Sequence, residues 1–284
     1  MDIIENKTFD EERALYGREG IRVVSCAFDG PADGESAFKE CTHVETEDCF
    51  FNLRYPFWHV DGLIIRSGHM TELCRAALWY STDIAISDSK LHGIKALREC
   101  SGVNITGCDI ISQEFGWSSG DVTMESCRVQ SEYFLLRARD IRFRNVDFSG
   151  KYSFQYVENA VLENCRFDTK DAFWHAENVT VKNSVIKGEY LAWYSKNLTL
   201  IDCTIIGTQP FCYCEGLRLV NCRMEGTDLC FEKSDVDAEI ITPVISVKNP
   251  RSGCVRLPEV GQIIMDDSKA AGQIIVTGAK NESV

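Results

Sequence analysis

The chain has 284 residues, of which 43 are acidic and 30 are basic, and its formal net charge at pH 7 is −13. This negative balance argues against nucleic acids and anionic membrane surfaces as partners, because both attract basic patches. Residues 1–20 are polar and acidic, unlike a secretion signal. No apolar run approaches the ~18 residues that a membrane-spanning helix needs. These features predict a cytoplasmic protein without nucleic-acid or membrane partners.

The middle of the chain repeats itself every 19 residues. The same apolar position recurs without an insertion at Ile84, Val103, Val122, Ile141, Ala160, Val179, Leu198 and Leu217. A fixed internal period of this kind is the signature of a solenoid, in which each repeat packs against its neighbours. The period therefore predicts the architecture before any motif is considered.

Each repeat alternates short strands with turns. With the opening apolar residue counted as position zero, positions zero and two are apolar and their neighbours are polar, which is typical of a half-buried strand. Positions four and eighteen are mostly Asn, Asp or Gly, which tolerate the left-handed backbone conformation of turns. Further short strands are expected around positions seven and thirteen. The pattern predicts an all-β, single-stranded parallel β-helix, right-handed as parallel crossover connections are.

The N-terminal residues 1–83 follow the template less regularly. Their coils open at Ile21, Val44 and Leu63. The unequal spacing predicts loop insertions near residues 31–34 and 70–74. A short helix is the competing interpretation of Asp10–Tyr16.

The period decays after Asp235. Residues 236–247 resemble one more coil, and the irregular or β tail that follows is expected to cover the last open strand edge, which would otherwise promote aggregation. We therefore expect a single domain over residues 1–284. Its regular coils occupy residues 84–235, and residues 236–284 form a C-terminal coil and cap.

Cysteines recur at fixed positions of the repeat. Seven of the fourteen are at position five: Cys26, Cys49, Cys108, Cys127, Cys165, Cys203 and Cys222. Such a column is too regular for a metal cage and indicates small buried apolar groups in a reducing cytoplasm. No histidine cluster supports a zinc site, so we expect no metal and no cofactor.

Aromatic residues form a second column. All five tryptophans occupy position fourteen: Trp58, Trp79, Trp117, Trp174 and Trp193. Tyr16 and Phe231 continue this column at its ends, and position fifteen adds His175, Tyr194 and Tyr213 among others. Because Lys39 and Arg98 share the tryptophan position, we expect the indoles to point outward or to be half-exposed.

The aromatic column has three interpretations. It is a platform for sugar rings or a protein partner, an interface buried in a homo-oligomer, or a stack that only stabilises the sheet. The candidate binding residues are Trp58, Trp79, Trp117, Trp174, Trp193, His175, Tyr194 and Tyr213.

Candidate catalytic residues are sparse. Position seventeen carries Glu158, Glu177 and Glu215, which are candidates for the carboxylate pair of glycoside hydrolysis. Lys196 interrupts this set, and carboxylates one coil apart lie closer than that reaction usually needs. No phosphate-binding loop or nucleophile elbow is present. The sequence leaves both an enzyme and a non-catalytic protein open.

The chain resembles the domain-of-unknown-function 3737 family of bacterial proteins. The matching segments include GREGIRVVSCAFDG (17–30), YPFWHVDGLII (55–65), SDVDAEI (234–240), SVKNPRSG (246–253) and EVGQIIMDD (259–267). The longest is DAFWHAENVTVKNSVIKGEYLAWYSKNLTLIDCT (171–204). The resemblance covers nearly the whole chain and implies a pectin-lyase-like right-handed β-helix, but no established reaction.

The function favoured by the sequence is a binding module whose aromatic column holds a saccharide or a protein partner. One alternative is a polysaccharide hydrolase or lyase-like enzyme, by analogy with other pectin-lyase-like proteins. The other is a structural or oligomeric scaffold.

Overall fold

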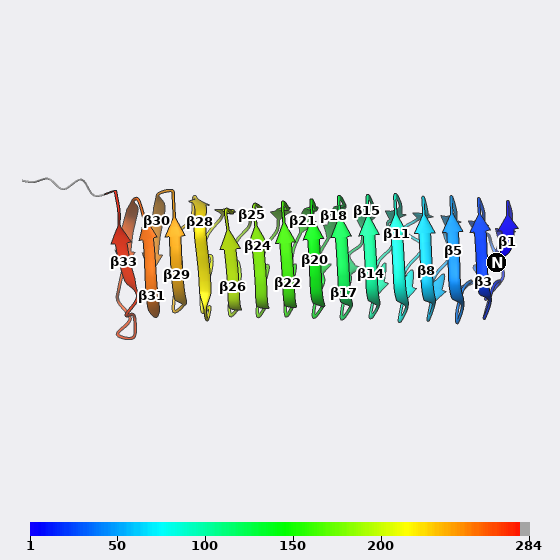
Figure 1. The fold of residues 1–284 in the computed structure, drawn as a ribbon, viewed down its shortest axis with the longest axis horizontal. Coiled ribbons are helices and arrows are strands. Elements are labelled where there is room, and N and C mark those ends of the chain that lie inside the picture. Colours follow the sequence, from blue (N-terminus) through cyan, green and yellow to red (C-terminus); the bar gives the residue numbers. More distant parts are fainter. Residues whose placement is uncertain (279–284) are drawn as a thin grey trace, which may run out of the picture. The chain divides into compact units, whose positions relative to one another are not determined.

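The computed structural model describes residues 1–278, and no helix occurs in that range. The chain forms two compact units, Met1–Ser149 and Gly150–Val284, which we describe separately. Each is a parallel β-helix with about 19 residues per coil (Figure 1). The predicted all-β class is confirmed, whereas the helix considered for Asp10–Tyr16 is wrong, because residues 11–17 form turns. A single domain over the whole chain stays a prediction.

The coil is right-handed in each unit. In Figure 1 the strands of the first face run upward in front, and the chain then passes behind at the top as it advances toward the C-terminus. This is the predicted sense, and it is the one that twisted parallel strands favour.

Residues 1–149 have three sides. The first face contains β1 (Asp2–Glu5), β3 (Glu19–Val24), β5 (Thr42–Glu47), β8 (Asp61–Arg66), β11 (Thr82–Ser87), β14 (Ser101–Thr106), β17 (Gly120–Glu125) and β20 (Arg139–Arg144). The second face contains β2 (Thr8–Phe9), β4 (Ala27–Phe28), β6 (Phe50–Phe51), β9 (His69–Met70), β12 (Lys90–Leu91), β15 (Asp109–Ile111) and β18 (Arg128–Ser131). The third side has only two-residue strands, β7 (Phe57–Trp58), β10 (Leu78–Trp79), β13 (Leu97–Arg98), β16 (Glu114–Phe115) and β19 (Tyr133–Phe134).

The second unit repeats the first two faces. Its first face contains β22 (Glu158–Glu163), β24 (Glu177–Lys182), β26 (Lys196–Ile201), β28 (Leu217–Glu225), β29 (Asp235–Ile240), β31 (Ser252–Leu257) and β33 (Gln273–Val276). Its second face contains β23 (Arg166–Asp168), β25 (Val185–Lys187) and β27 (Thr204–Ile206). A separate pair, β30 (Val244–Lys248) and β32 (Val260–Ile264), follows Cys230 on the third side, since Val247 bridges to Cys230. The remaining strand, β21 (Asp147–Gly150), contains the boundary between the units.

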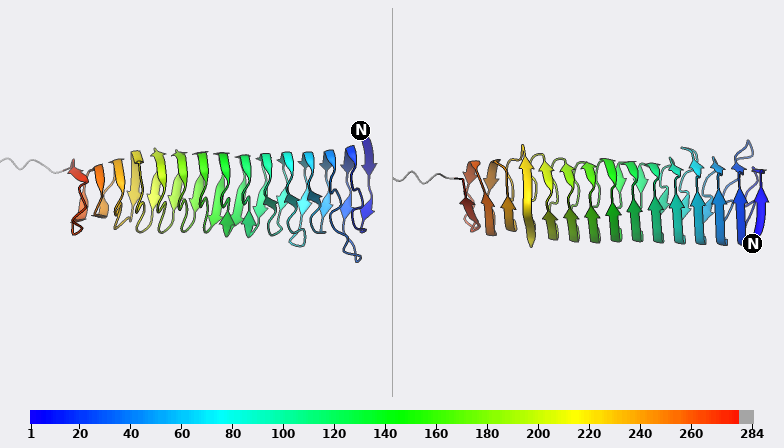
Figure 2. Two further views of the ribbon diagram at one scale, coloured as in Figure 1. Left: turned by 90° about the horizontal axis from the view of Figure 1, so that it is seen from below. Right: turned by 45° about the horizontal axis from the view of Figure 1, so that its top comes forward.

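The strand register follows the sequence period. Ile84 pairs with Val103, and Val179 pairs with Leu198, each 19 residues apart. Near the N-terminus the offsets are longer, because Ile21 pairs with Val44. The two predicted insertions protrude as loops from the blue and cyan coils in Figure 2. Like side chains therefore stack on like, about 4.8 Å apart.

The corners predicted at positions four and eighteen have the expected left-handed backbone. Asn183 at position four has a φ of 47°, and Asn197 at position eighteen has a φ of 52°. The side chains at the second corner also join the coils, because Asn197 Nδ2 donates to Asn178 Oδ1 at 3.0 Å. Asn197 thus lies at a corner of the coil, directly before Leu198 and Thr199 of β26.

On the third side of the second unit, the aromatic residues lie in turns and not in the strand expected near position thirteen. Alternate residues there have left-handed backbones, with φ of 55° at Tyr190, 60° at Ala192 and 61° at Tyr194. Such a residue other than glycine costs roughly 1–2 kcal/mol. Hydrogen bonds to both neighbouring coils offset this cost, since Tyr190 N donates to Thr208 O at 3.1 Å and Ala192 N donates to Ala172 O at 2.8 Å. Turns rather than strands therefore carry the aromatic residues.

The cysteines at position five do more than fill space. The thiol of Cys203 donates to Ile201 O at 3.3 Å, and that of Cys222 donates to Val220 O at 3.4 Å. Ser184 occupies the same position and donates to Lys182 O at 2.6 Å. Cys and Ser thus share a bond to the backbone at this turn, whereas Val146 and Gly68 occupy the same position without a side-chain donor. All fourteen cysteines are free thiols.

The coil continues beyond residue 247. β29 pairs in parallel with β31, and β31 pairs with β33, so residues 252–257 and 273–276 extend the first face. Most of the coil and cap predicted over residues 236–284 thus continues the coil, and residues 279–284 lie outside the described residues. Within residues 1–278, no helix is long and apolar enough to cross a membrane.

The core can be tested on β6, where neighbouring residues face opposite sides. Phe51 is fully buried and stacks on Phe28 with ring centroids 5.1 Å apart. We expect Phe51→Ala to lower the free energy of unfolding by about 3–5 kcal/mol in urea denaturation, through lost contacts and a cavity. The half-buried Phe50 is the control, and Phe50→Ala should cost less than half as much. Equal losses would contradict the inward orientation of Phe51.

Candidate functional site

All five tryptophans are half-buried on the outside of the coil. In residues 1–149 they stack with one another and with cations. The rings of Trp58 and Trp79 stack with centroids 5.5 Å apart, and Lys39 Nζ lies 4.2 Å from the Trp58 centroid. The guanidinium of Arg98 lies 5.6 Å from the Trp79 centroid and 5.5 Å from the Trp117 centroid. Such contacts contribute roughly 0.5–1 kcal/mol each at exposed sites, so this stack stabilises the coil.

In the second unit the indoles are bound to the backbone. Trp174 and Trp193 stack with centroids 5.5 Å apart and planes 6° from parallel. Trp174 Nε1 donates to Tyr190 O at 2.6 Å, and Trp193 Nε1 donates to Gln209 O at 2.9 Å. Their polar edges and one or both ring faces are therefore already engaged. Trp174 and Trp193 thus lie against the third side, and the tryptophan binding platform stays a prediction.

A more exposed aromatic row lies beside these indoles, and we call it the outer ladder. It consists of Tyr156, His175, Tyr194 and Tyr213. Successive ring centroids are 4.8, 5.0 and 4.8 Å apart, with planes within 10° of parallel. Tyr156 is 47% exposed and Tyr194 is 44% exposed. Because each inner ring is covered on both faces by its neighbours, the solvent sees mainly ring edges.

One extra residue in the coil after Tyr213 ends the outer ladder. Tyr194 N donates to Cys212 O at 3.1 Å, which is 18 residues ahead, whereas Tyr213 N donates to Glu232 O at 2.7 Å, which is 19 residues ahead. Lys233 therefore occupies the place where a further aromatic residue would lie. Its Nζ is 5.9 Å from the Tyr213 ring centroid.

The same shift corrects the expected end of the tryptophan column. Phe231 does not continue it but is fully buried in the core, with its ring 6.0 Å from that of Phe211. Tyr16, at the other predicted end, is 53% exposed and lies 5.8 Å from the Arg13 guanidinium.

A groove of about 530 Å³ begins where the outer ladder ends. We call it the ladder-end groove, and it is lined by Tyr194, Tyr213, Glu215, Lys233, Asn249, Arg251, Asp267, Lys269 and Ala270. It brings together three residues predicted from the sequence, the two tyrosines and Glu215. It holds three cations and two carboxylates, although the chain as a whole is strongly acidic.

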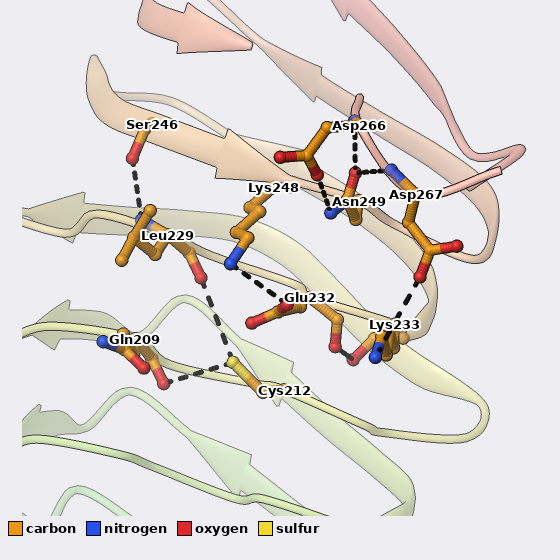
Figure 3. A network of polar contacts seen from close by, with 11 residues as sticks. Gln209, Cys212, Leu229, Glu232, Lys233, Ser246, Lys248, Asn249, Asp266 and Asp267 are labelled. Carbon is orange, nitrogen blue, oxygen red and sulfur yellow. Dashed lines mark hydrogen bonds and ion pairs between the residues drawn. The ribbon is translucent and has the colours of Figure 1, made fainter. Parts of the chain in front are cut away.

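A hydrogen-bond network centred on Asn249 forms one wall of this groove (Figure 3). Asn249 is 3% exposed. Its Oδ1 accepts from the N–H groups of Asp266 and Asp267 at 3.0 and 3.2 Å, and its Nδ2 donates to Asp266 Oδ1 at 2.7 Å. Asp267 Oδ2 lies 4.0 Å from Lys233 Nζ. The network thus connects the groove wall with the cation beside Tyr213.

The three candidate acids do not form one site. Glu158 and Glu177 are register partners on β22 and β24. Glu177 is paired with Lys196, whose Nζ lies 3.3 Å from its Oε1. Glu215 follows Lys196 on the next coil and lines the ladder-end groove. Of the three, only Glu215 lies in a groove together with a second carboxylate, that of Asp267.

The buried thiols of Cys212 and Cys222 are poor nucleophiles. Burial raises the pKa of Cys222 to about 11 and that of Cys212 to about 12. Since the thiolate is the reactive form, these groups are inert near neutral pH. Within residues 1–278 no group of three His, Cys, Asp or Glu side chains is arranged to hold a metal ion.

Comparison with protein families identifies the chain. The family described as "Protein of unknown function (DUF3737)" matches residues 2–276. The chain belongs to the DUF3737 family. The resemblance inferred from the sequence is thus confirmed. No curated protein matches this DUF3737 member.

Solved structures similar to this DUF3737 protein share little sequence with it. The Streptococcus pneumoniae surface protein and adhesin PfbA is 8% identical, covers 96% of this chain and 91% of its own, and has a TM-score of 0.37. The Azotobacter vinelandii mannuronan C-5 epimerase AlgE4 A-module is 10% identical over 96% and 87%, with a TM-score of 0.29. The polygalacturonase from Erwinia carotovora ssp. carotovora is 9% identical over 96% and 86%, with a TM-score of 0.26.

Sequence reasoning missed most of the polar groove residues. They are Lys233, Asn249, Arg251, Asp267 and Lys269. All of them follow the point at which the 19-residue period shifts, so the template assigned them no partners. The sequence signal was the presence of three of them, Asn249, Arg251 and Asp267, in the family segments at 246–253 and 259–267.

The environment of Tyr213 is testable by titration. Burial raises the pKa of its phenol, and Glu232 and Tyr194 raise it further. Because the folded-state pKa is raised, the associated stability is present below the unfolded pKa of about 10 and is lost as pH rises through the folded value. We expect the ultraviolet phenolate signal lost in Tyr213→Phe to have a midpoint above about 10. The urea-unfolded chain is the control, and an equal midpoint in both states would contradict the burial.

Proposed function

We propose that this DUF3737 protein binds an acidic saccharide in the ladder-end groove. The observation that carries the proposal is the end of the outer ladder at Tyr213, beside a groove with Arg251 and Lys269. The aromatic edges of Tyr194 and Tyr213 supply apolar contact for a sugar ring, and nearby cations supply partners for its charged group. Sites for small molecules commonly combine such an apolar surface with a few convergent polar groups.

Charge supports an acidic ligand over a neutral one. Among residues 1–278, neither Arg251 nor Lys269 forms an ion pair with a carboxylate within 4.0 Å. Both line the groove, so their charge is available to a ligand. A guanidinium matches a carboxylate in a two-pronged geometry, which favours a sugar acid as the ligand.

The outer ladder supports a ligand longer than one sugar. Its exposed edges carry the phenol groups of Tyr156 and Tyr194, with His175 between them. Hydroxyl and imidazole groups repeat about every 4.8 Å along this row. A saccharide chain lying beside the row finds a series of hydrogen-bond partners at regular spacing.

The fourteen free thiols support the cytoplasm as the site of action, because such thiols persist in reducing compartments. A homo-oligomer formed through the outer ladder is the competing proposal for this surface. This competing proposal predicts that a second copy lying over the outer ladder, rather than a ligand in the ladder-end groove, shields Tyr194 from solvent.

The proposal is tested by affinity measurements on glycan arrays and by calorimetry. We expect Arg251→Ala to weaken binding of acidic oligosaccharides about 10- to 100-fold, since a hydrogen bond to a charged group contributes about 1.5–3 kcal/mol. Tyr213→Ala should weaken acidic and neutral analogues alike. Binding should fall with rising salt.

The matched control is Arg166→Ala on β23, an exposed arginine of the same unit that does not line the groove. It should bind like the wild type. A wild-type protein that binds no glycan at high concentration would sink the proposal, as would equal losses in Arg166→Ala and Arg251→Ala.

A second candidate function is glycoside hydrolysis in the same groove, favoured by the pairing of Glu215 with Asp267 there. One carboxylic acid would protonate the leaving oxygen and the other carboxylate would assist attack. This candidate predicts new reducing ends from a bound acidic oligosaccharide, lost in Glu215→Gln while binding persists. Glu158→Gln is the control, and the absence of product from every bound glycan removes this candidate.

A further inference from the structure

The ladder-end groove differs at its two ends. Its lining residues come from successive coils, beginning with Tyr194 and Tyr213 and finishing with the loop that holds Asp267 and Lys269. On the ladder side, the exposed edges of His175 and Tyr156 continue the surface. On the far side, the loop at residues 266–272 stands between β32 and β33. The groove therefore begins at the outer ladder and ends at this loop.

The closing loop is anchored at both of its ends. At its start, Asn249 Oδ1 binds two successive backbone N–H groups, those of Asp266 and Asp267. At its finish, Ala271 N donates to Arg251 O at 3.2 Å and Gly272 N donates to Pro250 O at 3.0 Å. Hydrogen bonds at both of its ends thus hold the loop in place.

Within the loop, Asp267 forms a turn with Lys269 and Ala270. Asp267 Oδ1 accepts from Lys269 N at 2.9 Å, and Asp267 O accepts from Ala270 N at 3.0 Å. This turn presents Lys269 and Ala270 to the groove. The loop thus lines one side of the groove and places the charged Lys269 there.

Asn249 is the residue on which the wall depends. Its backbone N donates to Ile264 O at 2.8 Å, and its O accepts from Lys233 N at 2.9 Å. With its side-chain amide bound to the loop as well, this one residue connects three successive coils. Gly272 has no room for a side chain, since an added Cβ would lie 2.7 Å from Pro250 Cβ. Gly272 therefore packs closely against Pro250 at the end of the loop.

We infer that the groove receives the end of a saccharide chain, with the loop at residues 266–272 as the stop and Asn249 as its positioning residue. This inference rests on the proposed function. The terminal unit lies against Tyr213 with its acidic group near Arg251 and Lys269. The rest of the chain lies along the outer ladder, where nothing blocks it.

Recognition of a chain end has a measurable consequence. A linear chain has one end of each kind, so the number of proteins bound per chain stays at one whatever the chain length. A groove open at both ends would accept internal segments, and the number bound would rise with length.

The test uses wild-type protein with short, medium and long fractions of linear oligogalacturonate and oligomannuronate, as acidic probes, in calorimetry and sedimentation. We expect one protein per chain for every length. A number that rises in proportion to length, with binding intact, overturns the inference and leaves the proposed function standing. No binding to these probes or to any other acidic glycan removes both.

Asn249→Ala supplies the matched variant. With the loop released, we expect the number bound to a long chain to exceed one, and the affinity for the short fraction to fall about tenfold, since one ordered wall contact is lost. Asn221→Ala, which removes an exposed amide bonded to Asp202 away from the groove, is the control and should behave as wild type. Should Asn249→Ala fail to fold, Asp267→Ala loosens the loop tip instead. One protein per long chain in the folded loop variant counts against the stop.

Discussion

Backbone hydrogen bonds between successive coils hold each residue about 4.8 Å from its counterpart one coil away. This constraint places chemically similar side chains above one another, as in Trp174 and Trp193 or Asn178 and Asn197. It also limits what a column of aromatic rings can do. Rings at this spacing cover each other, so a long ladder presents edges along its length and a free face only at an end.

A functional site in such a molecule is therefore expected where the repetition stops. In the second unit the 19-residue repeat is interrupted by a single added residue before Asp228. That residue moves Phe231 into the core beneath Phe211 and places Lys233 beside Tyr213. The following coils are irregular, and their loops bring Arg251 and Lys269 to the same place. Regular coils build the walls of the molecule, and the departure from regularity builds the ladder-end groove.

The sequence predicted the coil well because its signals are local. Alternating Val179 and Val181 indicate a strand, and Asn183 and Asn197 indicate left-handed corners. The third side was predicted less well. Left-handed backbones at Ala192 and Tyr194 contradict the usual preferences of those residues, and only hydrogen bonds to both neighbouring coils stabilise them. Residue propensities and the alternation of apolar and polar residues do not reveal such hydrogen bonds between coils.

By itself, the sequence determined the period, the family, and which residues share a column, because a constant repeat length fixes which side chains can meet. It identified Tyr194, Tyr213 and Glu215 as candidates for the same reason. The tertiary structure decided that the indoles are occupied by backbone contacts, that Tyr213 ends the outer ladder, and that Asn249 clamps the loop beside it. The contacts of Tyr213 and Asn249 join coils of unequal length, so no fixed spacing in the sequence could reveal them.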